Sequence, residues 1–154
     1  MHTMGLTMKR RTLLLLTPAL ALVLSSCGAS DPKAFADRFT AAESKAWQTG
    51  DLHDLEAAED PGIVFHLPGD INLTGWKAHA DYITTSRPKI SNLHQEWKYI
   101  TGEGNHIVLS YKSSATMDGN NLTNDDLFVL RLNNGRVAEI WANGTMTTAP
   151  AKSE

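Results

Sequence analysis

The chain has 154 residues, with 14 basic and 17 acidic side chains and a single cysteine. A lone cysteine excludes an intramolecular disulfide, and three of the basic residues lie within the first eleven positions. Eleven basic and seventeen acidic residues remain beyond them, a net charge of −6 without any cluster of lysine and arginine. This balance argues against a nucleic-acid partner, because phosphate backbones are bound by clustered positive charge.

Residues 1–26 are predicted to be an export signal. A basic segment begins at Met8, the apolar run Leu13–Leu24 follows, and small residues close the segment, as in a secretory signal peptide. The run has 12 residues and contains Pro18, whereas a membrane-spanning helix needs roughly 20 apolar residues. The sequence leaves open whether Met1 or Met8 is the start, and whether export follows the general or the twin-arginine route.

Cys27 is predicted to carry a lipid anchor. The segment Leu24-Ser25-Ser26-Cys27 resembles the lipobox of bacterial lipoproteins. The resemblance implies cleavage before Cys27, acylation of its thiol and attachment to the outer face of the bacterial cell membrane. Each buried methylene of an acyl chain adds about 0.8 kcal/mol to such an attachment. The alternative is an ordinary signal peptide with a chance cysteine.

The remainder is long enough for one domain, which we place at residues 32–147 between a lipidated tether (27–31) and a polar tail (148–154). A helix is predicted from residue 31 or 32 to about 48, with an apolar stripe at three- and four-residue steps. A short helix is expected over 52–58, a strand over 63–67, and a third helix over 76–85.

From residue 90 onward the pattern alternates as in strands. Turns at residues 102–105, 118–121 and 133–135 divide this half into four consecutive strands, the last predicted to end at residue 143. Helices followed by an antiparallel meander indicate an α+β fold. A curved sheet over three helices would enclose a conical cavity.

Two segments resemble a known family. Residues 64–69 (Val-Phe-His-Leu-Pro-Gly), and residues 124–132 with 135–141, are similar to strands of SnoaL-like proteins, which belong to the nuclear transport factor 2-like (NTF2-like) superfamily. The resemblance implies a conical fold with three N-terminal helices on a curved, mostly antiparallel sheet. It leaves function open, because one fold hosts many functions.

His66 and Asp126 are the candidate catalytic residues. In the resembled family the position of His66 commonly faces the cavity, and a histidine exchanges protons near neutral pH. Asp126 shares strand parity with Phe128, and an acid in apolar surroundings has a raised pKa. The alternatives are a hydrogen-bonded histidine without a chemical role and a solvated acid at a strand end.

Aromatic and polar side chains are predicted to line the cavity, although most aromatic residues of this kind serve only as core. The predicted lining consists of Trp47, Tyr82, Trp97, Tyr99, Tyr111, Asn124, Phe128 and Trp141. No metal site is expected, because His53, His66, His79, His94 and His106 are scattered along the chain, and no cofactor is expected.

Three functions remain open. The favoured one is a membrane-anchored domain that binds a small apolar or amphipathic molecule in its cavity. The second is a cofactor-independent SnoaL-like enzyme, an isomerase, cyclase or dehydratase, in which His66 and Asp126 exchange protons with a small carbonyl compound. The third is a homodimer or partner-binding module that uses the open face of the sheet.

Overall fold

The computed structural model describes residues 31–69 and 71–150, so Cys27 and the predicted signal lie outside the described part. The first half of the described chain contains three helices. α1 (Pro32–Thr49) and α2 (His53–Ala58) come first, and α3 (Trp76–Ser86) follows after two strands. A short 3-10 turn, η1 (Arg87–Lys89), leads into the second half of the chain. Within the described residues, no helix has both the length and the apolar character needed to cross a membrane.

The strands form one sheet in the order β2-β1-β6-β5-β4-β3. Their bounds are β1 (Glu59–Leu67), β2 (Ile71–Thr74), β3 (Ile90–Glu103), β4 (His106–Met117), β5 (Asn120–Asn133) and β6 (Arg136–Pro150). Only β1 and β6 run parallel to each other, whereas the other neighbours are antiparallel. The prediction of four consecutive neighbouring strands after residue 90 is therefore confirmed.

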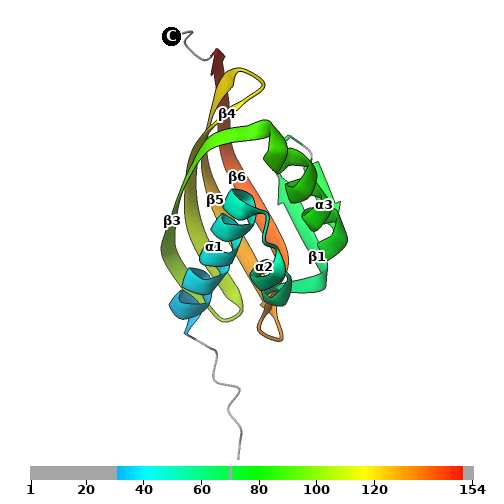
Figure 1. Cartoon of the computed structure of the whole chain (residues 1–154). Helices are drawn as coiled ribbons and strands as arrows, with labels where there is room; N and C mark the ends of the chain where they lie inside the picture. The colour runs from blue at the N-terminus through cyan, green and yellow to red at the C-terminus, as the bar shows by residue number, and fades with distance from the viewer. Residues whose placement is uncertain (1–30, 70, 151–154) are drawn as a thin grey trace, which may run out of the picture.

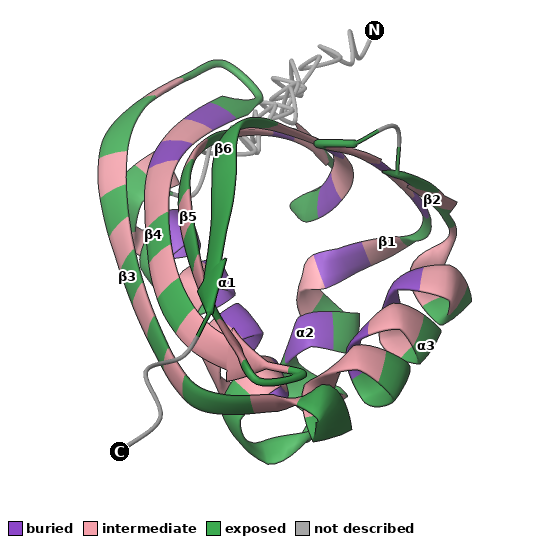
Figure 2. Ribbon diagram, turned by 90° about the horizontal axis from the view of Figure 1, so that it is seen from above, coloured by how far each residue is buried: buried purple, intermediate pink, exposed green. Residues whose placement is uncertain are grey.

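The sheet curls around the helices, so it has an inner face toward them and an outer face (Figure 2). α1 packs against β3 and β4, and α3 packs against β1. The inner face carries most of the core, including Phe65, Leu109, Leu130 and Ile140, with Phe39 from α1. In Figure 1 the far ends of β4, β5 and β6 extend past the helices, so part of the inner face has no helix over it.

The start and the end of α1 follow from local chemistry. The side chain of Asp31 accepts a hydrogen bond from the backbone N–H of Lys33 at 3.0 Å, which satisfies one of the free donors at the helix start. Gly50 ends the helix with φ of 82°, a left-handed conformation that glycine adopts without steric cost. The predicted helix bounds are accurate to about one residue as a result.

Three elements differ from the prediction. β1 begins at Glu59 rather than at residue 63. β2 was not predicted, because four residues after a Pro-Gly turn carry little periodic signal. β6 continues to Pro150 and pairs with the start of β5, from Thr147 opposite Thr123 to Pro150 opposite Asn120. The segment predicted as the beginning of a polar tail is thus part of the sheet, held by backbone hydrogen bonds rather than by apolar burial.

Candidate functional site

A cluster of aromatic side chains covers the inner face of the meander. Trp97, Tyr111 and Phe128 come from three neighbouring strands, and their ring centroids lie 4.2 to 5.6 Å apart. The register places Trp97 opposite Tyr111, and Phe128 opposite the buried Leu109, so all three rings face the helices. Each ring is only half-buried. We call these three residues the aromatic wall.

Polar groups lie beside the aromatic wall. The side-chain amide of Gln95 donates to the Tyr111 hydroxyl at 3.2 Å, and Asn124 donates to Ser113 at 3.1 Å. The indole nitrogen of Trp97 and the amide oxygen of Gln95 are both buried without a hydrogen-bond partner. Because a buried unpaired polar atom costs about 1–3 kcal/mol, these two atoms indicate a place where a ligand group or a water completes the bonding.

Helix α1 and helix α3 contribute two further aromatic side chains. Trp47 of α1 meets Tyr82 of α3 edge to face, with ring centroids 5.8 Å apart. A hollow of about 390 Å³ opens next to Trp47 and is bordered by the η1 turn and by Leu93 at the start of β3. Arg87 borders the same hollow, and its guanidinium donates to the backbone carbonyl of Gln48 at 2.9 Å, which anchors η1 to the end of α1.

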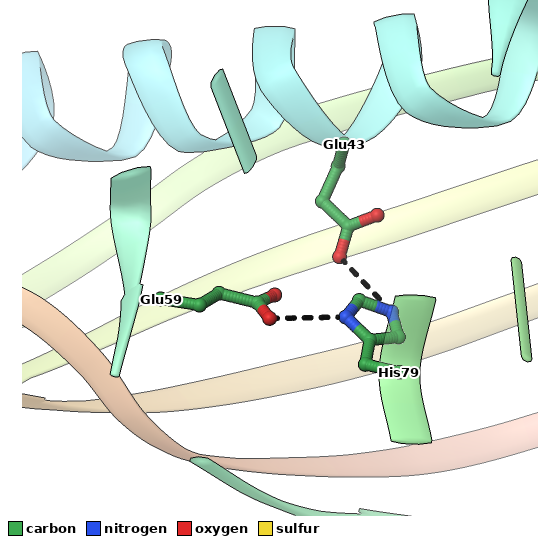
Figure 3. Close-up of side chains that lie close together, drawn as sticks. All are labelled: Glu43, Glu59 and His79. Atoms are coloured by element: carbon green, nitrogen blue, oxygen red, sulfur yellow. Dashed lines mark hydrogen bonds and ion pairs between the residues drawn. The ribbon is translucent and has the colours of Figure 1, made fainter. Parts of the chain in front are cut away.

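Below the aromatic wall, three ionisable side chains from distant parts of the sequence converge in the core. They are Glu43 of α1, Glu59 of β1 and His79 of α3, with exposed fractions of 5 %, 1 % and 4 %. The two ring nitrogens of His79 face different carboxylates (Figure 3). Nδ1 lies 3.1 Å from Oε2 of Glu59, and Nε2 lies 3.9 Å from Oε1 of Glu43.

Burial changes the ionisation of all three groups. It raises the pKa of Glu59 to about 9, so this carboxyl group is protonated at neutral pH. Burial also raises the pKa of Glu43, to about 7, against the opposing influence of His79. The pKa of His79 is lowered, chiefly by burial, with Glu43 acting in the other direction. Both shifts favour the uncharged forms, a neutral His79 ring next to a protonated Glu59.

The sequence predicted no metal site, yet one donor atom from each of Glu43, Glu59 and His79 lies within 4.8 Å of the others. Divalent cations are bound by groupings of this composition. However, the carboxylates lie on opposite nitrogens of the ring, and an ion held in the ring plane on one nitrogen would directly reach only the carboxylate on that side. As they stand, His79 is within hydrogen-bond distance of Glu59 alone, and Glu43 lies beyond that distance from the other ring nitrogen.

The structure does not bring the two predicted catalytic residues together. On β1 the buried Phe65 packs against His79, with ring centroids 4.1 Å apart, so its neighbour His66 faces outward by alternation. There the His66 ring stacks on Trp141, and its Nε2 lies 2.9 Å from Oε1 of Glu139. Asp126 pairs with Tyr111 across the ladder and faces inward. The two candidates therefore lie on opposite faces of the sheet.

The predicted cavity lining divides in the same way. Five of the eight residues face inward from the sheet, namely Trp97, Tyr99, Tyr111, Asn124 and Phe128. Trp47 and Tyr82 meet on the helix side. Trp141 instead lies on the outer face, because it follows the buried Ile140 on β6 and pairs with His66.

Asp126 sits at the edge of the aromatic wall. Its carboxylate lies against Gly144 of the neighbouring strand, where a side chain at position 144 would overlap it. Partial burial, with a smaller influence from Asp125, raises the pKa of Asp126 above its usual range. Its ionised form is therefore less favoured than that of a solvated aspartate.

The outer face is largely polar. A hollow of about 380 Å³ is lined there by serine, threonine and charged side chains, including Lys112 and Asp125, which form an ion pair at 3.0 Å. Leu127 is half exposed on this face and pairs with Ser110. A homodimer through this face stays a prediction.

The comparisons with known proteins agree with this architecture. A family model described as a SnoaL-like domain matches residues 34–140, and no curated protein matches the sequence. The helices followed by a curved six-stranded sheet are the NTF2-like fold. The chain belongs to the SnoaL-like domain family, which includes both ligand-binding and enzymatic members.

Solved structures with the same fold are distant in sequence. An LEH-like epoxide hydrolase of M. tuberculosis is 15 % identical with a TM-score of 0.61, over 73 % of this chain and 84 % of the other. An NTF2-like protein of unknown function from Burkholderia pseudomallei is 19 % identical with a TM-score of 0.62, over 75 % and 92 %. Bal32a, from a soil-derived mobile gene cassette, is 16 % identical with a TM-score of 0.64, over 75 % and 92 %. At these identities the likeness extends to the fold alone.

Proposed function

We propose that this chain is an exported, lipid-anchored domain that binds a small amphipathic molecule against the aromatic wall. The observation that carries the proposal is the combination of three half-buried rings with two buried, unpaired polar atoms beside them, Trp97 Nε1 and Gln95 Oε1. Ligand sites typically join apolar and aromatic walls to a few polar groups that fix orientation.

The pair of unpaired atoms narrows the chemistry of the ligand. Trp97 Nε1 is a donor and Gln95 Oε1 is an acceptor. A hydroxyl group can pair with either atom, since it both accepts and donates hydrogen bonds. We therefore expect an apolar skeleton carrying a hydroxyl or a similar polar group.

The proposed lipid anchor at Cys27 is the second part of this proposal. Cys27 and the wall are separated in sequence by the tether and the helices, and the domain carries a net negative charge. Attraction to anionic lipid headgroups would therefore not supply the proposed membrane attachment. Acylation of Cys27 would hold the site at the membrane surface, where amphipathic molecules are concentrated.

The binding site is tested by tryptophan substitution on the two faces of the sheet. The chain from residue 28 onward is titrated with the dye anilinonaphthalene sulfonate, and dye fluorescence reports binding. Trp97→Phe keeps the ring but removes the indole donor, and should weaken binding about tenfold, equivalent to about 1.4 kcal/mol. Trp141→Phe is the matched control, because Trp141 lies on the outer face.

Equal weakening by the two substitutions, or by Trp141→Phe alone, would place the dye on the outer face and contradict the proposal. Native mass spectrometry of the same protein, purified without added ligand, then shows whether a cellular molecule is retained and gives its mass.

A further inference from the structure

The proposed binding site makes no use of the hollow of about 390 Å³ at the end of α1. The last turn of α1, the η1 turn and the first residues of β3 border this hollow, and no residue of the aromatic wall does. Its volume lies within the range of roughly 300–1,000 Å³ that is typical of small-molecule sites. The bordering residues are Trp47, Gln48, Arg87, Pro88, Ile90, Ser91, Asn92 and Leu93.

Arg87 is the only charged residue around this hollow in the described part of the chain, and no described carboxylate pairs with it. By contrast, Arg131 on the outer face donates to Glu139 through both Nε and Nη2, at 3.0 and 2.8 Å. In Arg87, Nη2 donates to the backbone carbonyl of Gln48 at 2.9 Å, whereas Nε is buried without a hydrogen-bond partner. A buried, unpaired N–H of a charged group costs free energy, so the hydrogen bonding of Arg87 is incomplete.

The guanidinium of Arg87 is held in one orientation. A Cβ at position 50 would lie 3.6 to 3.7 Å from its Nη1, Cζ and Nε alike. These nearly equal distances mean that Gly50 covers one face of the planar group. The N–H groups lie in the plane and are directed to its edges. A donor that is already fixed loses little conformational entropy when a ligand binds to it.

The start of β3 adds a polar group and an apolar border to the hollow. Asn92 has φ of 52°, a conformation that asparagine tolerates better than most residues. It lies where the register between β3 and β4 shifts, between Ser91 and His94, and such bulges often redirect side chains beside functional sites. The exposed amide of Asn92 can donate a hydrogen bond to a ligand, while Trp47 and Leu93 supply apolar surface.

We propose that this hollow is a binding site for a small organic carboxylate, with Arg87 as the residue that recognises the carboxylate group. The two oxygens of a carboxylate accept from two parallel N–H groups of a guanidinium, and such charge-assisted pairs are stronger than neutral ones. The apolar border accommodates the hydrocarbon part of the ligand. The site is separate from the aromatic wall, so neither proposal depends on the other.

The test measures binding of phenylpropionate to the full-length chain in a non-ionic detergent, by isothermal titration calorimetry at neutral pH, where the probe is ionised. Phenylpropionamide is the matched ligand, because it has the same hydrocarbon part without the charge. We expect the amide to bind at least about tenfold more weakly, since it cannot form the charge-assisted pair. Equal affinities of the two ligands would overturn the proposal.

Substitutions of Arg87 test its role directly. Arg87→Gln removes the charge and should weaken binding of phenylpropionate at least about tenfold. Arg87→Lys keeps the charge but lacks the planar fork, and should weaken binding by a smaller factor of about five. If Arg87 only caps α1, both variants lose stability but bind phenylpropionate as the wild type does, and this result would overturn the proposal.

Two controls separate the hollow from other parts of the chain. Arg136→Gln makes the same change in net charge at an exposed position where β5 turns into β6, and should leave binding unchanged. Trp97→Phe, which should weaken binding at the aromatic wall, should also leave it unchanged. Weakening by Trp97→Phe equal to that by Arg87→Gln would assign the probe to the wall and overturn the proposal.

Nuclear magnetic resonance of isotopically labelled arginine side chains locates the bound probe. The Nε–H signal of Arg87, identified by its loss in Arg87→Lys, should shift when phenylpropionate is added. The signal of Arg131 should stay in place, because its Nε already donates to Glu139. A shift at Arg131 without one at Arg87 would overturn the proposal.

Circular dichroism checks that the Arg87 variants fold. If they do not, the wild-type chain decides, because phenylpropionate must then shift an arginine Nε–H signal that phenylpropionamide leaves in place. Arginine signals that respond to neither ligand, or equally to both, would overturn the proposal.

Discussion

Replacement of Glu59 by glutamine should stabilise the protein at neutral and alkaline pH. Glutamine has nearly the same shape as a protonated glutamate and can still donate to Nδ1 of His79. The folded protein keeps Glu59 protonated up to a pKa of about 9, whereas the unfolded chain ionises it at about 4.5. Between these values the unfolded state binds fewer protons, so the free energy of unfolding falls as the pH rises.

The magnitude follows from the pH interval. From 4.5 to pH 7 the interval is about 2.5 units, and each unit corresponds to about 1.4 kcal/mol. Glu59 therefore lowers the free energy of unfolding of the wild-type protein at pH 7 by up to about 3.5 kcal/mol. Glu59→Gln removes this contribution, and its advantage should vanish near pH 4 and grow further above pH 7. His79 acts in the opposite direction below its usual pKa, because its own pKa is lowered.

Urea unfolding of wild type and variant, followed by tryptophan fluorescence at several pH values, measures this difference directly. The expected result is two curves of stability against pH that converge in acid and separate in alkali. A variant that is less stable than wild type at pH 7 would refute the reasoning. It would mean that Glu59 is ionised and paired with a charged His79, and that substitution leaves a buried charge without its partner.

Three further changes have defined outcomes. Gly144→Ala should destabilise the fold by at least about 2 kcal/mol, because its Cβ would overlap the backbone of Asp125 and Asp126 as well as the Asp126 side chain. Gly62→Ala should have little effect, since the nearest atom to its Cβ is 3.4 Å away, and thermal unfolding compares the two variants. Asp31→Ala should cost about 1 kcal/mol in the same assay through loss of the cap on α1. Cys27→Ser should move the protein from the membrane to the soluble exported fraction on cell fractionation, and retention at the membrane would contradict a lipid anchor.

Most of the fold could be predicted from periodicity. The helical stripe of α1 and the alternation in β3, β4 and β5 are consequences of one-sided burial, which fixes both element type and register. β2 and the end of β6 could not be predicted, because their residues bury little apolar surface. They join the sheet through backbone hydrogen bonds, which any residue except proline can donate.

The candidate site was harder to predict than the fold. Glu43, Glu59 and His79 are separated by 16 and 20 positions, and no local motif links them. A signal did exist, since Glu43 lies on the buried stripe of α1 between Ala42 and Ala46, and His79 shares the buried side of α3 with Ile83. Burying a charged residue on an apolar stripe costs free energy. Such a residue is therefore a better indicator of a functional site than its position in a strand alone.

His66 shows the converse. Alternation correctly placed it on the face opposite Phe65, but which face of the sheet the helices cover depends on long-range packing. The contact between Phe65 and His79 of α3 fixes this choice, and no feature of residues 63–67 reports it. The same ambiguity put Trp141 among the expected lining residues.

A crystal structure of the protein with anilinonaphthalene sulfonate bound tests the central claim most directly. We predict that the dye lies on the inner face of the sheet, between the aromatic wall and Trp47, with a polar group within hydrogen-bond distance of Trp97 Nε1 or Gln95 Oε1. Dye found only on the outer face, beside Trp141 and Leu127, would contradict the account.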